Sequence, residues 1–298
     1  MNKCINVNKL YEQDSKLKKD EVKILLVWCG QQRHFPKVTE LQIALALHAC
    51  YYSLEQAKGC LENYFTIRGH CKDIFIVKHP DDDPALRQAM NVSLLTILPE
   101  KTNEGYYIML GKLINTNPDL YNPQIDSKLF DILVLSHLHQ EGTGNGLVFV
   151  MDMKGGVFGH LTKLNLGIFK KFLVYLQTAM PIRLIAVHFI NVVPFMDKLL
   201  AIVKPFINKE MFQKIIIHTH NENLYNYVPL ECLPSDYGGK ADTVQVYFEK
   251  MKEKIYNNLW FIELQNTMVT DESKRIGPRK NSESLFGFDG SFKKLSVD

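Results

Sequence analysis

The first 75 residues carry apolar positions at the spacing of helices. Val22, Leu25, Leu26 and Cys29 recur at i, i+3, i+4 and i+7, which is typical of one side of an amphipathic helix. Pro36 ends this segment, because proline cannot continue a helix. The pattern predicts a compact N-terminal unit made of helices.

Two capping signals divide the next part of that unit. Thr39 is the expected N-cap of a helix over residues 40–51. Ser53 is followed by Gln56 three residues later, which is the sequence of a capping box. The helix after Ser53 is expected to bury one apolar stripe, formed by Leu54, Ala57, Cys60, Leu61, Tyr64 and Phe65.

From residue 92 onward, short apolar runs alternate with helical segments. We expect Asp83 to cap a helix over residues 84–91, because acidic residues before Pro84 are typical of a helix start. Strands are predicted at Ser93–Leu98, Tyr106–Leu110, Leu147–Met151, Leu184–Ile190 and Ile215–His218. Helices are predicted at Asp126–Gln140, Phe169–Thr178 and 195–206.

This alternation predicts an α/β fold with a largely parallel sheet that is buried on both faces. The helical N-terminal unit comes before it in the chain. Residues 271–298 are polar and contain several glycines, so a poorly regular tail is expected there.

The segment Val193–Phe206 has too many apolar residues for an ordinary surface helix. Only Asp197, Lys198 and Lys204 are charged within it. A helix that is apolar nearly all round is either buried on all sides or exchanges between a protein interior and a membrane. The residues alone leave both interpretations open.

Composition excludes several classes of protein. The 298 residues are 46% apolar and 22% charged, which is typical of a globular protein, and the net charge of +3 is too weak to indicate nucleic-acid binding. The longest uncharged stretch, Leu41–Leu54, is too short to span a bilayer. The first residues lack the apolar core of a secretory signal, so we expect none. Six scattered cysteines indicate reduced thiols in the cytosol.

The sequence offers no clear catalytic or metal site. Gly142–Gly146 precedes a strand, whereas phosphate-binding glycine loops follow one. His218 and His220 share a strand face but lack a third ligand at a suitable spacing, and His137 and His139 point in different directions on a helix. We therefore expect no metal, no cofactor and no enzymatic activity.

Several motifs between residues 151 and 239 resemble those of the CRAL-TRIO lipid-binding family. They are Asp152-Met153-Lys154-Gly155, Pro181-Ile182-Arg183-Leu184, His188-Phe189-Ile190-Asn191, Lys204-Pro205-Phe206-Ile207, Ile215–His218 and Leu233-Pro234-Ser235-Asp236-Tyr237-Gly238-Gly239. The N-terminal helices resemble the extension that precedes the lipid domain. Gly290–Leu295 is similar to the ending of arthropod-type members. The pattern is nearest to the tocopherol-transfer branch.

The resemblance implies a lobe in which a sheet floor and helical walls enclose a hydrophobic ligand. A mobile lid over residues 193–206 would cover it, with the apolar residues Phe195, Met196, Leu199, Leu200 and Val203. The implied wall and ligand-contact positions are Leu129, Leu133, Ser136, Phe158, Phe172, Tyr175, Leu176, Met180, Ile182 and Val187. The implied division of the chain is 1–78 helical, 79–258 lipid-binding and 259–298 a tail packing on the lobe.

Two departures from the tocopherol-transfer branch alter the expected ligand contacts. Leu129 and Leu133 stand where that branch has small hydroxyl residues, so Ser136 and Tyr175 are the nearest replacements as a polar anchor.

The basic cluster that binds phosphoinositide head groups in that branch is also changed. Arg183 and Lys214 match two of its members, with Lys204 and Lys209 as partial replacements. Ile185 and Glu210 stand at two other basic positions.

The resemblance thus implies a monomeric, cytoplasmic carrier that contacts membranes peripherally. It would transfer a tocopherol, retinoid or carotenoid without covalent chemistry. Two alternatives remain: a phosphatidylinositol or phosphoinositide exchanger, and an adaptor that recruits a protein partner to membranes.

Overall fold

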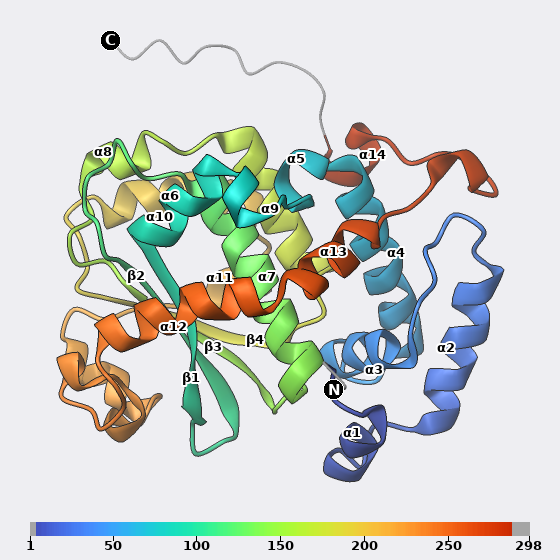
Figure 1. Cartoon of the computed structure of the whole chain (residues 1–298), viewed down its shortest axis with the longest axis horizontal. Coiled ribbons are helices and arrows are strands. Elements are labelled where there is room, and N and C mark those ends of the chain that lie inside the picture. Colours follow the sequence, from blue (N-terminus) through green and yellow to red (C-terminus); the bar gives the residue numbers. More distant parts are fainter. Residues whose placement is uncertain (1–3, 288–298) are drawn as a thin grey trace.

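A five-stranded sheet in the order β1-β2-β3-β4-β5 organises the larger part of the chain (Figure 1). The computed structural model describes residues 4–287. The strands are β1 (Ser93–Lys101), β2 (Tyr106–Leu113), β3 (Gly146–Asp152), β4 (Leu184–Ile190) and β5 (Ile215–Ile217). β1 and β2 form an antiparallel hairpin, and β2 to β5 run parallel. The predicted α/β fold is therefore confirmed.

Helices connect the parallel strands, as parallel pairing requires. The segment between β2 and β3 contains α7 (Pro123–Glu141), and that between β3 and β4 contains α8 (Phe158–Leu161) and α9 (Leu166–Thr178). Between β4 and β5 lie α10 (Met196–Val203), a 3₁₀ turn (Lys204–Phe206) and α11 (Lys209–Gln213). The predicted helix over 195–206 thus changes to the tighter 3₁₀ geometry at Lys204.

The N-terminal helices gather on one side of the molecule, coloured blue in Figure 1. They are α1 (Val7–Gln13), α2 (Lys19–Gln31), α3 (Glu40–Ala49), α4 (Leu54–His70) and α5 (Lys72–Phe75), followed by α6 (Pro84–Val92). α2 buries Val22, Leu25 and Cys29, whereas Leu26 is 38% exposed. The buried stripe of α2 is therefore narrower than the full apolar repeat.

The predicted residues cap their helices, but the capping box lies at Thr39 and not at Ser53, where it was predicted. Asp83 accepts a hydrogen bond from the backbone N–H of Leu86 and so begins α6. The reciprocal capping box lies at Thr39, where Gln42 Oε1 accepts from the Thr39 N–H. At Ser53 only the side chain of the cap residue bonds, to the N–H of Gln56.

A buried polar cluster joins the N-terminal helices to the sheet domain. Arg68 of α4 forms an ion pair with Asp131 of α7 at 2.6 Å, and Tyr175 of α9 donates to the other oxygen of Asp131 at 2.6 Å. Tyr64 donates to the side chain of Gln265 in α13 (Leu259–Thr267). We call these five residues the seam. Their positions on four helices tie both parts of the chain together.

The C-terminal part returns to both units. α12 (Val244–Asn257) crosses beside β1, α13 (Leu259–Thr267) follows it, and α14 (Ser282–Phe286) is short. Because Leu95 on the free edge of β1 donates its N–H to Met251 Sδ, α12 covers the edge of the sheet.

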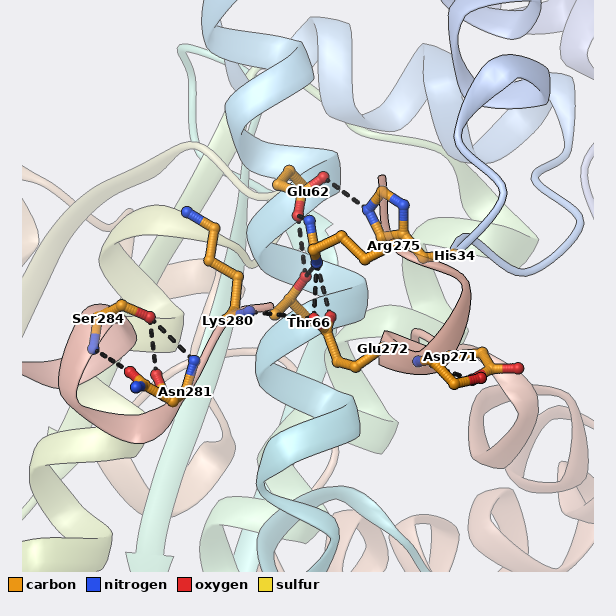
Figure 2. Close-up of polar contacts among 10 residues, drawn as sticks. His34, Glu62, Thr66, Asp271, Glu272, Arg275, Lys280, Asn281 and Ser284 are labelled. Carbon is orange, nitrogen blue, oxygen red and sulfur yellow. Dashed lines mark hydrogen bonds and ion pairs between the residues drawn. The ribbon is translucent and has the colours of Figure 1, made fainter. Parts of the chain in front are cut away.

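The segment after α13 is held to α4 by charged side chains (Figure 2). Arg275 bonds Glu62 and Thr66 of α4, and Glu272 binds the same guanidinium. Glu62 also accepts from His34 at 3.2 Å. The segment after α13 thus has little regular structure, as predicted, and side-chain bonds hold it to α4. Gly290–Leu295 lie outside the described residues.

Candidate ligand-binding site

The two faces of the sheet differ in how well they are covered. On one face, side chains in register on β2, β3 and β4 are buried, with Leu110, Val150 and His188 fully enclosed. Tyr227 lies over the His188 ring, at 4.8 Å between centroids, and covers this face. This side of the sheet is an ordinary packed core.

The opposite face is packed at one end and open at the other. Near β2 it is closed, because Met109 is fully buried. Across β3, β4 and β5, two rows of apolar side chains that lie in register on this face are only partly covered. Ile217, at the end of one row, is 37% exposed. We call these six residues the open wall: Phe149, Met151, Val187, Phe189, Ile215 and Ile217.

The helix expected to act as a lid is likewise poorly buried. Of the eight residues of α10, only Met196 is buried. Leu199, Leu200 and Val203 are half-buried, and so is Phe195, which precedes the helix. Apolar side chains left in this state would gain free energy from any apolar partner that removed them from water.

A network of side-chain hydrogen bonds fixes the chain where it leaves β4 for this helix. Asn191 has a φ of 49°, a conformation that asparagine tolerates better than most residues. Its Nδ2 donates to Asp152 Oδ1 at 2.7 Å, and its backbone N–H donates to Asn221 Oδ1 at 3.0 Å. The start of the lid segment is thus held at the carboxyl ends of β3 and β4.

Asp152 is the centre of this network. Burial alone would raise the pKa of its carboxyl group, but the bonds from Lys112 and Tyr237, with those from Asn191 and a backbone N–H, together lower it. Lys112 Nζ lies 2.5 Å and Tyr237 Oη 2.7 Å from Oδ2. The Asp152 and Tyr237 motifs noted in the sequence therefore meet at one point and have a structural role.

Both ends of the lid segment contact neighbouring helices. At its start, the Phe195 ring meets that of Phe158 in α8, with centroids 6.0 Å apart. At its end, Gln177 of α9 donates to the carbonyl of Phe206 at 3.0 Å and accepts from the N–H of Asn208 at 2.8 Å. The half-buried helix α10 lies between these two attachments.

The predicted wall residues fall into different environments. Val187 belongs to the open wall, Leu176 and Ile182 are half-buried, and Phe158 is 49% exposed. Met180 is buried in the segment after α9. Phe172 is also buried and contacts Phe130 of α7, at 6.0 Å between ring centroids.

Neither hydroxyl expected to act as a polar anchor is free. Tyr175 is fully buried in the seam, where it donates to Asp131, and Ser136 donates to the Leu133 carbonyl at 3.2 Å. Leu129 is fully buried. Leu133 lines a separate pocket beside β1 and α12. Phe130, also on α7, is the residue whose ring meets that of Phe149, at 5.6 Å between centroids.

Three of the basic residues expected to bind anionic lipid already have partners. Arg183 donates from Nε to the His48 carbonyl and lies over the Tyr51 and Tyr52 rings, at 4.4 and 4.9 Å. Lys214 forms an ion pair with Glu210 at 3.0 Å. Lys204 lies over the Phe212 ring at 5.5 Å.

Sequence reasoning missed part of the open wall. Phe149, Met151 and Phe189 lie on predicted strands at alternate positions, so their common side was readable from the period of two. The strands are apolar at nearly every position, however, so the sequence does not show which of the two faces of the sheet is left partly uncovered.

Two further features of the described residues bear on membranes and metals. Within residues 4–287, no helix has the length and apolar character needed to cross a bilayer. The same residues contain no group of three or more His, Cys, Asp or Glu side chains arranged to hold a metal ion.

Comparison with known proteins covers most of the chain. Residues 91–239 match the family model of the CRAL/TRIO domain, and residues 14–85 match that of the Pinta-like, UBA domain. Alpha-tocopherol transfer protein-like of Mus musculus is 29% identical over 198 residues, covering 65% of this chain and 57% of that protein. Clavesin-1 of Xenopus laevis is 29% identical over 208 residues, covering 69% and 62%.

The chain thus spans less than two thirds of the length of both relatives. The crystal structure of Sfh5 aligns over 78% of each chain with a TM-score of 0.44 and 17% identity. The CRAL/TRIO model covers half of the 298 residues, from the last turn of α6 to the glycine pair after Tyr237. The chain belongs to the CRAL/TRIO family.

Proposed function

We propose that this protein binds a hydrophobic small molecule against the open wall and transfers it between membranes. CRAL/TRIO proteins bind and transfer lipophilic ligands, and the ligand class favoured here is a tocopherol, retinoid or carotenoid. The observation that carries the proposal is the open wall itself: six apolar side chains in register that neighbouring helices leave partly uncovered.

The driving force would be burial of apolar surface. Each square ångström removed from water contributes about 25 cal/mol, so an apolar ligand on the wall gains affinity without any strong polar contact. Because Ser136 and Tyr175 are occupied, we do not assign a polar anchor to either. The proposed contact set combines Phe149, Met151, Val187 and Phe189 with half-buried Leu176.

The segment 193–206 would act as the lid. Its attachments at Asn191 and Gln177 serve as fixed ends, and the half-buried α10 between them is the part that moves. In water the open lid would expose Leu199, Leu200 and Val203, which is unfavourable. At a bilayer the same side chains enter the interface, so opening is favoured there.

The proposed setting is the cytoplasm, with a monomeric protein that touches membranes peripherally. No covalent chemistry is needed, since the driving force is apolar burial alone. Basic residues near the lid would favour anionic membranes in general over one selected head group, because Lys214 already has Glu210 as a partner.

Lipid extraction from the purified full chain, followed by mass spectrometry, tests the ligand class. A prenyl-type antioxidant, retinoid or carotenoid supports the carrier. Phosphatidylinositol or a phosphoinositide supports an exchanger instead. Protein that contains no lipid and transfers none between vesicles supports the adaptor.

A further inference from the structure

A second pocket lies where α12 crosses the edge of the sheet. Its volume is about 240 Å³, and it is an open pocket lined by residues of β1, α7 and α12 and by Asp242. Ile97, Leu133 and Met251 form an apolar floor, and Lys250 and Lys254 stand one helical turn apart on α12. None of its lining residues belongs to the open wall. The pocket is therefore separate from the site proposed above.

The two lysines differ in their partners. Lys250 forms an ion pair with Asp242 at 2.6 Å and has a side chain that is 56% exposed. Lys254 is half-buried, and no carboxylate of residues 4–287 lies within 4.0 Å of its ammonium group. Burial lowers the pKa of Lys254, and the charge of Glu141 only partly opposes this effect. The pocket thus contains one cation without a neutralising partner.

The surroundings add positive potential at the same point. His137 of α7 is neutral and adds no charge there, because burial lowers its pKa to about 3. The positive charges of Lys254 and Lys101 lower that pKa further. His137 Nε2 is also buried and has no hydrogen-bond partner among the described residues.

We propose that this pocket binds a medium-chain carboxylate, with its chain on Ile97, Leu133 and Met251 and its carboxylate on Lys254. The volume exceeds that of an apolar cavity of about 150 Å³ that holds benzene, and it is below the 300–1,000 Å³ of drug-sized sites. One unpaired ammonium matches one carboxylate, and a charge-assisted hydrogen bond between them is stronger than a neutral one. The site does not depend on what occupies the open wall.

Octanoate is the probe, and methyl NMR of the full chain reports where it binds. Met251 lines this pocket and Met151 belongs to the open wall, so their methyl signals distinguish the two sites. We expect a saturable shift of the Met251 signal. Lys254→Gln should weaken the binding read there by about tenfold, and so should replacing octanoate by neutral octanol.

Lys252→Gln is the matched control, because Lys252 lies on the same helix, pairs with Glu249 and does not line the pocket. It should bind octanoate like the wild type. The proposal is overturned if the Met251 signal does not move, if only Met151 responds, or if Lys254→Gln and Lys252→Gln bind octanoate equally. Equal affinity for octanoate and octanol in the wild type would also overturn it.

Discussion

The seam and the lid region are packed in opposite ways. In the seam, Arg68, Asp131 and Tyr175 are almost fully buried, and Asp131 pairs with both of the others. In the lid region, seven of the eight residues of α10 are at least partly exposed. The difference teaches that a fully buried polar joint and a half-buried apolar helix occur in the same molecule. In the proposed mechanism the joint keeps the scaffold in place while the lid moves.

The seam should produce the largest effect on stability. Asp131→Ala removes the partner of a buried arginine and leaves its charge uncompensated, which typically costs about 3–5 kcal/mol. Denaturant unfolding measures the loss. Asp20→Ala is the control, because Asp20 has a 92% exposed side chain and should change stability by less than about 0.5 kcal/mol. Equal effects of the two variants would show that the seam is not a joint.

The buried carboxyl group of Asp126 in α7 should make the stability of the protein depend on pH. Burial raises the pKa of Asp126 to about 7, and the bond from Ser93 only partly opposes this. Below about pH 4 the carboxyl group of Asp126 is protonated in both the folded and the unfolded protein. Between pH 4 and 7 the folded state holds the proton that the unfolded state has lost, so stability falls as the pH rises, by up to about 1.4 kcal/mol per pH unit.

Asp126→Asn should remove this loss and become more stable than the wild type as the pH approaches 7. Unfolding curves at pH 4.5, 6 and 7.5 would check it, with the surface change Asp119→Asn as the control. A constant difference between Asp126→Asn and the wild type across these pH values contradicts the assignment of a buried, neutral carboxyl group.

Substitutions in the lid should slow ligand transfer between vesicles more than they reduce the stability of the fold. Replacing Phe195 and Leu199 by aspartate places charge on the side that enters the membrane, so vesicle-to-vesicle transfer should slow by at least about tenfold. Because both residues are only half-buried, the fold should survive. Ala201→Asp adds one aspartate charge at an exposed position of α10 and should leave transfer near the wild-type rate. A folded double variant that transfers normally would remove the lid from the mechanism.

The smallest effect is expected from the basic residues. Lys204→Gln should weaken binding to anionic vesicles by up to about 1 kcal/mol, less at high salt. Lys214→Gln should weaken it less, because Glu210 already neutralises Lys214. Vesicle sedimentation at two salt concentrations measures both. A sharp preference for one phosphoinositide that disappears in either variant would contradict this order.

Local sequence signals determined most of the secondary structure. The predicted strand Leu184–Ile190 coincides with β4, and Asp83 and Thr39 cap the helices that they were expected to cap. Such features depend on neighbours within a few residues, where the backbone and one side chain decide the outcome. The α/β order follows from the same local periodicities.

Tertiary packing decided the site. Tyr175 and Val187 both fit an apolar wall by sequence, but Asp131, 44 residues away from Tyr175, draws its hydroxyl into the seam. Arg183 has the charge expected of a lipid-binding residue, and the Tyr51 and Tyr52 rings cover it. Strands that are apolar on both faces contain no signal of which face a helix will cover. That choice depends on the distant helices that pack against the sheet, and so only the three-dimensional arrangement left Phe149 and Phe189 partly open.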